Sequence, residues 1–248
     1  MTLRPIPTLR IGCAGWSIVP AYAADFPREG SHLERYAQVF DAVEINSSFY
    51  RPHLRKTYAR WADSTPRDFR FAVKMPKLIS HQKRLRGCEA ELDAFLDQAG
   101  GLGDKLGVLL LQLPPSLAFE PAIVSAFFEQ LRRNCPGAVA CEPRHASWFH
   151  AGADRMLRDR AVARVGADPA RVPRAAVPSG DRRIEYLRLH GSPRMYWDSY
   201  SEASLQRIAG RLSRPDAGTR TRWCIFDNTA AGHAISNALE LERMLARR

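Results

Sequence analysis

Eight short apolar runs recur at intervals of about 30 residues along this 248-residue chain, and they constrain its fold more than any other feature. The segments between most of them show helical periodicity. Alternating strands and helices predict parallel strands joined by helical crossovers, and eight such units close into a TIM-type (β/α)8 barrel of about 250 residues. The runs are Ile11–Trp16, Ala42–Asn46, Phe69–Lys74, Leu106–Leu113, Ala138–Glu142, Ala161–Val165, Glu185–His190 and Arg222–Asp227. We therefore expect a single α/β barrel domain over residues 1–248.

The crossover segments predict helices, with one exception. Ser31 and Glu34 match a capping box, and Pro121 stands where a helix tolerates proline, at its first turn. Helices are expected over residues 31–40, 53–62, 89–98, 121–131, 147–160, 201–212 and 230–246. The segment Asp168–Arg183 holds three prolines and Gly180 and leaves little room for a helix. The barrel is therefore expected to be irregular, with its sixth helix short or missing.

Several of the expected strands carry aliphatic residues on one parity and polar residues on the other. Side chains alternate between the two faces of a strand, so such strands make two different surfaces. If the aliphatic parity packs under the helices, the polar parity points to the barrel axis, and its last members lie at the rim where barrel enzymes place their active sites. These rim residues are Glu44, Asn46, Lys74, Gln112, Glu142, Arg188 and His190.

So many buried ionisable groups are costly unless they pair with one another or serve a ligand. A purely structural explanation is an internal ion-pair network in which Glu44 and Glu142 neutralise Lys74 and Arg188. Against it, aliphatic residues usually fill the inner layers of such barrels and would serve stability more simply.

Six long segments of the chain resemble the domain of unknown function 72 family, also called YecE-like. They are VEINSSFY from Val43, FRFAVKMPKLISHQKRL from Phe69, LLQLPPS from Leu110, CEPRHASW from Cys141, YLRLHG from Tyr186 and FDNTAAGHAISNALEL from Phe226. The resemblance covers nearly the entire chain and implies a TIM-barrel fold. It supplies no activity.

The resemblance also marks individual residues as part of the family pattern. Beyond the rim residues, it includes Gly15, Trp16, Ser17, Phe49, Tyr50, Pro76, His81, Arg84, Pro114, Pro115, Arg144, His145, Ser147, Trp148, Gly191, Asn228 and Gly232. This chain departs from the pattern at Pro143, where many members have phenylalanine, and at Asp227, where many have asparagine.

Positive residues outnumber negative ones around the expected rim. The positive set is Arg51, Lys74, Lys77, His81, Arg84, Arg144, His145, Arg188, His190 and Arg194, against Glu44, Glu142 and Asp168. Guanidinium groups suit carboxylate and phosphate oxygens, and aromatic residues beside them could stack on a base or sugar ring. These aromatic residues are Trp16, Phe49, Tyr50, Trp148, Tyr196 and Trp197. The pattern predicts an anionic ligand.

The leading hypothesis is an enzyme that cleaves a phosphate-bearing substrate at the carboxyl-terminal face of the barrel, as a phosphoester or phosphodiester hydrolase or a lyase. Glu44 and Glu142 would be acid/base groups or metal ligands, while Lys74, Arg188 and His190 would stabilise developing negative charge. Together, Glu44, Lys74, Glu142 and His190 are the catalytic candidates. The substrate-binding candidates are Trp16, Asn46, Tyr50, His81, Arg84, Gln112, Arg144, His145, Arg188 and Asn228.

Three alternatives stay open. Lys74 could donate a proton or form an imine in a lyase or isomerase acting on a small metabolite. The chain could instead bind nucleic acid or an anionic metabolite without chemistry. A divalent metal could assist the reaction, although the sequence has no His-x-His pair, which argues against it.

Other features set bounds on function. Ser47, Ser48 and Cys141 lack the context of a catalytic triad, and Gly100–Gly103 is not followed by the lysine of a phosphate loop. The net charge of +11 rests largely on arginine, a bias that a GC-rich genome also produces. The five scattered cysteines are expected to be reduced. No signal peptide or apolar run of about 20 residues is visible, so we expect a cytoplasmic protein without a membrane partner.

Overall fold

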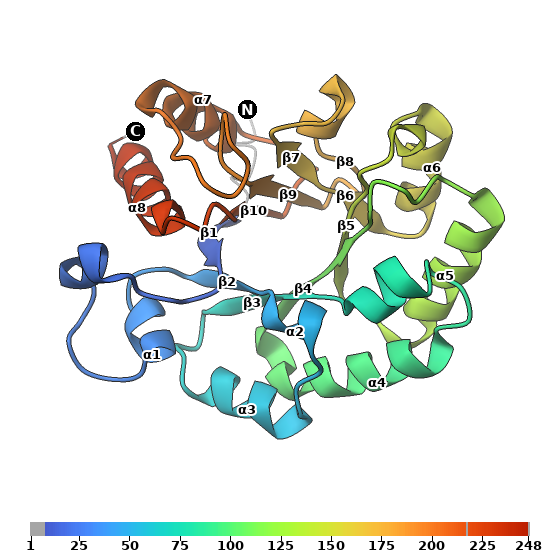
Figure 1. Ribbon diagram of the computed structural model, residues 1–248, viewed down its shortest axis with the longest axis horizontal. Helices are drawn as coiled ribbons and strands as arrows, with labels where there is room; N and C mark the ends of the chain where they lie inside the picture. The colour runs from blue at the N-terminus through green and yellow to red at the C-terminus, as the bar shows by residue number, and fades with distance from the viewer. Residues whose placement is uncertain (1–7, 217, 248) are drawn as a thin grey trace, which may run out of the picture.

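The computed structural model describes residues 8–216 and 218–247 and contains the expected barrel. Its strands surround a central axis and its helices form an outer layer (Figure 1). The parallel strands are β1 (Thr8–Ala14), β2 (Ala42–Ile45), β3 (Arg70–Lys74), β4 (Leu106–Gln112), β5 (Ala138–Glu142), β6 (Val162–Arg164), β7 (Gly166–Asp168), β9 (Ile184–Leu189) and β10 (Thr221–Phe226). Each predicted run contains a strand whose ends differ from the prediction by three residues at most.

The sixth predicted strand is the one that closes the barrel. It is divided into β6, which pairs with β5, and β7, which pairs with β9, and Val165 alone separates them. Pairing then continues from β9 through β10 to β1 and on to β5. The segment 162–168 therefore acts as one barrel strand that joins both sides of the sheet, and a two-residue strand, β8 (Ser179–Gly180), pairs antiparallel with β6.

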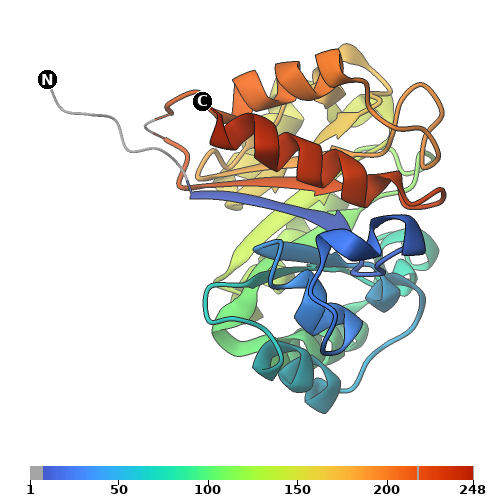
Figure 2. The same ribbon diagram turned by 90° about the vertical axis from the view of Figure 1, so that its left-hand side faces the viewer.

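The helices lie outside the strands, as the side view shows most clearly for α8 (Figure 2). They are α1 (His32–Tyr36), α2 (Ser47–Tyr50), α3 (Arg55–Asp63), α4 (Glu89–Ala99), α5 (Pro121–Asn134), α6 (Ala151–Asp159), α7 (Glu202–Leu212) and α8 (His233–Ala246). Short 3-10 turns are η1 (Pro20–Asp25), η3 (Gly100–Lys105), η4 (Ala146–Trp148) and η5 (Pro173–Ala176), and η2 (Leu78–Gln82) is a π-helical turn.

Helix α1 begins with the expected capping box but is shorter than the predicted 31–40. The Ser31 hydroxyl accepts a hydrogen bond from the Glu34 amide, and the Glu34 carboxylate accepts one from the Ser31 amide. The Tyr36 hydroxyl accepts from the Cys13 amide and donates to the Ala42 carbonyl, so it bridges β1 and β2. The helix ends at Tyr36, and after a turn over residues 37–39 the chain enters β2 at Ala42.

The sixth crossover is irregular, as the prolines predicted. Between Asp168 and Ile184, a stretch that the structure describes throughout, there is no α-helix, only η5 and β8. A β/α barrel lacking its sixth helix is therefore confirmed.

The core has two parts, which correspond to the two strand parities. The larger part lies between strands and helices and includes Val43, Ile45 and Cys141. The smaller part shares the opposite parity, inside the barrel: Ala42, Ala72, Val108, Leu110, Ala140, Ala163, Val165, Tyr186, Trp223 and Ile225. Along these strands, the next inward positions are the polar ones. In the described part of the chain, no helix has both the length and the apolar character needed to cross a bilayer.

Candidate active site

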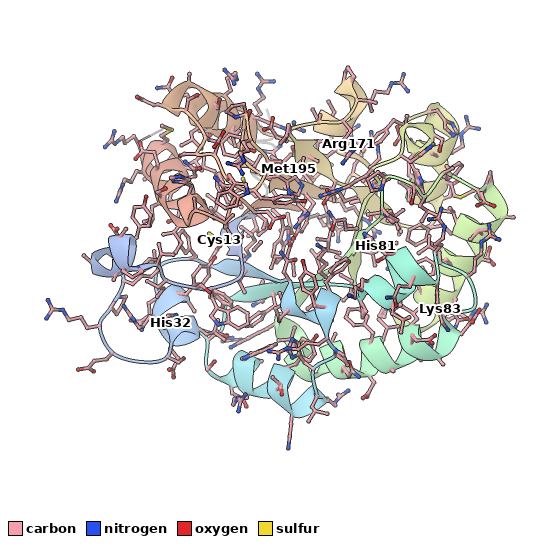
Figure 3. All side chains as sticks on the ribbon, in the orientation of Figure 1. Cys13, His32, His81, Lys83, Arg171 and Met195 are labelled. Carbon is pink, nitrogen blue, oxygen red and sulfur yellow. The ribbon has the colours of Figure 1, made fainter. Side chains whose placement is uncertain are left out.

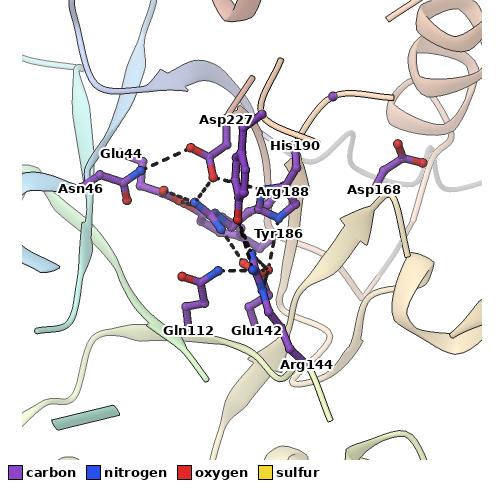
Figure 4. A network of polar contacts seen from close by, with 12 residues as sticks. Glu44, Asn46, Gln112, Glu142, Arg144, Asp168, Tyr186, Arg188, His190 and Asp227 are labelled. Carbon is purple, nitrogen blue, oxygen red and sulfur yellow. Dashed lines mark hydrogen bonds and ion pairs between the residues drawn. The ribbon is translucent and has the colours of Figure 1, made fainter. Parts of the chain in front are cut away.

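Arg188 lies at the centre of the polar layer at the carboxyl-terminal end of the barrel (Figure 4). Its side chain has 0% exposure. Its Nε and Nη2 donate to the two oxygens of Glu44 at 3.0 and 2.7 Å. Its Nη1 donates to Glu142 Oε2 at 2.6 Å, and Nη2 also donates to Asp227 Oδ2 at 2.8 Å. One guanidinium thus holds three carboxylates that come from three different strand ends.

His190 closes this network on the side facing the loops. Its Nε2 lies 3.1 Å from Glu142 Oε1, and its Nδ1 lies 3.0 Å from Asp227 Oδ2. Both nitrogens face carboxylate oxygens, and only an imidazolium has two N–H donors. Burial lowers the pKa of His190, but the charge of Glu142 and the two hydrogen bonds outweigh it and raise the pKa above its ordinary value. We therefore treat His190 as a cation.

The carboxylates of Glu142 and Asp227 are held in their ionised forms. Burial raises the pKa of each, but Arg188 and His190 more than compensate and leave both pKa values below their ordinary range. Glu44 accepts three hydrogen bonds, two from Arg188 and a third from the Tyr186 hydroxyl, at 2.8 Å to Oε2.

Lys74, at the end of β3, differs from its neighbours. Its residue exposure is only 7%, and within the described residues its amine forms no ion pair. The Nζ lies 4.3 Å from the centroid of the Phe49 ring. Burial and the charge of Arg188 lower the pKa of Lys74 to about 8, although Glu44 and other carboxylates act in the opposite direction. The expected pairing of Glu44 and Glu142 with Lys74 is thus wrong, because Arg188 occupies both carboxylates.

Three other predicted residues border the network. Gln112 Nε2 lies 3.5 Å from Glu142 Oε1, and Arg144 Nε donates to the same oxygen at 3.0 Å. Asn46 Nδ2 lies 3.4 Å from Asp227 Oδ1, while the buried Asn46 side-chain oxygen has no hydrogen-bond partner among the residues that the structure describes.

A loop after β9 reaches over this region. The Tyr196 hydroxyl accepts two hydrogen bonds from Arg144, both 3.1 Å long. Arg171 and Met195, both labelled in Figure 3, line a cavity of about 10 Å³ together with Glu142, Arg144 and His190. That volume holds about one water molecule, so this cavity has no room for a substrate.

Several predicted binding residues instead stabilise loops. Arg84 donates to the Ser116 carbonyl at 2.8 Å. His145 accepts from the Ser147 amide at the start of η4. Asn228 is fully buried and donates to the Asp198 carbonyl at 3.0 Å. Trp148, one of the aromatic residues expected beside the rim, is also buried. These residues shape the loops around the site without pointing into the network.

Trp16, His81 and Tyr50, which were expected to bind substrate, make other contacts or face solvent. The Trp16 ring packs edge-on against Trp61. His81 packs edge-on against Phe49, and burial together with Lys74 lowers its pKa. Tyr50 is 70% exposed and lines a separate hollow outside the barrel.

Asp227 and Tyr186 were not predicted as site residues, and Tyr196 was expected only among the aromatic residues beside the rim. Asp227 and Tyr186 could have been found, because they share the inward parity of their strands with the chosen residues. Tyr196 lies in a loop, and no periodicity indicates that its hydroxyl meets Arg144.

The carboxylates do not fit a metal site. Arg188 and His190 occupy both oxygens of Glu142 and Oδ2 of Asp227. Across residues 8–216 and 218–247, no three His, Cys, Asp or Glu side chains are grouped so that they could hold a metal ion.

Comparisons with known proteins agree on one family. A family model described as protein of unknown function DUF72 matches residues 10–248. UPF0759 protein YecE of Escherichia coli K12 is 35% identical over 138 residues, which are 55% of this chain and 50% of that protein. The chain thus matches about half the length of this relative. UPF0759 protein YunF of Bacillus subtilis 168 is 22% identical over 95% of this chain and 94% of its own.

Solved structures show the same fold. A DUF72 family protein from Thermotoga maritima MSB8 superposes with a TM-score of 0.79 and 25% identity, covering 96% of this chain and 99% of that chain. A DUF72 family protein from Enterococcus faecalis V583 superposes with a TM-score of 0.80 and 20% identity, covering 96% of this chain and 96% of that chain. The resemblance and the barrel expected from the sequence are both confirmed.

Proposed function

This chain belongs to the family of proteins of unknown function DUF72, and we propose that it is an enzyme acting on a small phosphate-bearing substrate at the carboxyl-terminal end of its barrel. In this proposal the Lys74 amine moves the proton of the reaction, in a lyase-type cleavage or an isomerisation.

The charge balance of the network supports the proposal. Glu44, Glu142 and Asp227 carry three negative charges, and Arg188, His190 and Arg144 carry three positive ones through direct hydrogen bonds. Lys74 adds a positive charge for which the described residues provide no ion pair. A buried cation without a partner is costly. A bound anion would supply that partner, and this unpaired amine is the observation that carries the proposal.

The pKa of about 8 makes Lys74 suitable for proton transfer. A proton-transfer group works best when its pKa lies near the operating pH, because both of its forms are then populated. The charged amine can hold the anion and donate a proton, and the neutral amine can accept one. Glu142, with its lowered pKa, stays ionised beside Arg188 and is better suited to holding Arg188 and His190 in place. We therefore assign proton transfer to Lys74 and positioning to the carboxylates.

Proton exchange in heavy water tests the proposed function. Sugar phosphates and phosphorylated hydroxy acids that raise the melting temperature are incubated with the protein in D2O, and proton NMR follows the loss of carbon-bound hydrogen. The wild-type protein should exchange one substrate proton, and Lys74→Met should not. Lys56→Met, on the exposed surface of α3, is the matched control and should exchange like wild type.

Exchange that persists in Lys74→Met would contradict the assignment to Lys74. Borohydride added during turnover separates two routes. Covalent trapping at Lys74 indicates an imine, while its absence with exchange intact indicates general-base catalysis.

A further inference from the structure

A second hollow lies next to the active site and shares Phe49 with it. We name it the aryl groove; it has a volume of about 400 Å³, and its apolar walls are Phe49, Pro52, Pro76, Leu78, Ala94 and Phe95. It lies between α2, the η2 turn and α4, and Figure 1 shows α2 over β3 and β4 with α4 on its outer side. The volume is within the range of small-molecule sites.

We propose that the aryl groove binds an aromatic ring carried by the anionic substrate, so that the substrate is an aryl-bearing phosphate. This inference rests on the proposed function and specifies its substrate class. Phe49 connects the two sites, because the same ring lies 4.3 Å from Lys74 Nζ and forms part of the groove wall. A ring bound in the groove would therefore contact the same side chain that contacts the lysine amine.

The groove walls suit a ring better than a charged or extended ligand. Phe49 presents its ring edge-on to Tyr50 and to His81, with centroids 5.1 and 5.0 Å apart. Two proline rings add flat apolar surface. Tyr50 is 70% exposed and Leu78 is 38% exposed, so apolar surface at this groove faces water in the free protein. Covering it with an aromatic ring would be favourable.

Charge also favours an anionic aromatic ligand. The exposed cations Arg51 and Lys77 line the groove, and among the described residues neither forms an ion pair. The acidic residue of the lining, Glu91, is already paired with Lys83. The groove therefore combines apolar walls with free positive charge, which complements an aryl group attached to phosphate.

A pair of matched ligands tests the inference by calorimetric titration. Phenyl phosphate and methyl phosphate carry the same charge and differ in the ring. For wild type we expect phenyl phosphate to bind roughly tenfold more tightly or better, because burial of a ring is worth at least that factor. Ala94→Trp fills the groove and should remove the difference. Ala90→Trp, one turn earlier on the exposed surface of α4, is the control and should preserve it.

A second variant guards against misfolding of the first. Leu78→Ala removes part of the apolar wall without adding charge, and it should weaken phenyl phosphate while leaving methyl phosphate unchanged. Equal affinity of wild type for both phosphates would overturn the aryl groove but leave the anion site intact. Failure of both phosphates to bind would overturn the proposed function as well. Binding of phenol as tight as that of phenyl phosphate would overturn the link between ring and anion.

Discussion

The buried charge of Lys74 destabilises the folded protein, and the loss in free energy of unfolding can be measured. The pKa of Lys74 is about 8 in the folded protein against an ordinary 10.5, so folding disfavours the charged form. At pH 7 the amine is charged in both the folded and the unfolded state and the penalty is fully present. It disappears as the pH rises from 8 towards 10.5, where the folded state loses its proton first.

Lys74→Met should therefore stabilise the protein while abolishing anion binding. We expect its free energy of unfolding at pH 7 to exceed that of wild type by about 1–3 kcal/mol, since 2.5 pKa units correspond to at most about 3 kcal/mol. The difference in free energy of unfolding between the variant and wild type should be smaller at pH 10. Denaturant titrations at both pH values measure it. Destabilisation of the variant at pH 7 would instead show that Lys74 has a structural partner.

Arg188 has the opposite character, because removing it leaves Glu44, Glu142 and Asp227 buried and facing one another without their shared cation. Breaking a buried ion pair from one side typically costs about 3–5 kcal/mol. Arg188→Met is expected to lose at least this much stability, or not to fold, as seen by chemical denaturation and circular dichroism. Arg243→Met, which breaks an exposed pair with Asp25, should change stability by less than about 1 kcal/mol.

At the scale of elements, strands could be predicted and loops could not. A strand such as β5 was predictable to the residue because an apolar run bounded by turn signals leaves few choices. Strand parity also placed Glu44, Glu142 and Arg188 on the axis. The partners of each group depend on the stagger between strands, which no single run encodes. Arg188 therefore took the carboxylates that the sequence suggested for Lys74.

The roles of loop residues were also not predictable from the sequence. Arg84, His145 and Asn228 are polar and lie near strand ends, so the sequence marks them as candidates for binding. In the structure each satisfies a backbone group of a neighbouring loop. Such contacts depend on the path of the loop in space, and that path has no periodicity from which it could be predicted.

The junction of β1 and β2 offers a test of the element level. A Cβ on Gly12 would lie 2.0 Å from the Ala42 carbonyl oxygen and 3.0 Å from the Tyr36 hydroxyl that bridges the two strands. Gly12→Ala must therefore force the strands apart, at a cost of about 3 kcal/mol. Thermal and denaturant unfolding measure the loss. Gly137→Ala, where the nearest atom is Cys135 Sγ at 3.8 Å, should stay within about 0.5 kcal/mol of wild type.

For the whole molecule, the network predicts how stability depends on pH. The pKa of His190 is raised in the folded state, so its stabilising contribution is complete below 6.5 and is lost as the pH rises through the folded value. Glu142 and Asp227 have lowered pKa values, so their contribution is present above their ordinary pKa values and is lost in acid. His190→Gln should flatten the decline in stability above pH 6.5 and preserve the acid limb. A variant with the same alkaline decline as wild type would contradict the imidazolium assignment.

The central claim is that a bound anion is the missing partner of the charged Lys74 amine, and sulfate binding measured by calorimetry between pH 6 and pH 10 tests it most directly. Sulfate keeps its charge over this range, so any change in affinity reports on the protein. The affinity of wild type should be constant below about pH 8 and then fall about tenfold per pH unit as the amine loses its proton. Lys74→Met should bind sulfate weakly at every pH. An affinity for sulfate that does not change with pH, or that survives in Lys74→Met, would contradict the account.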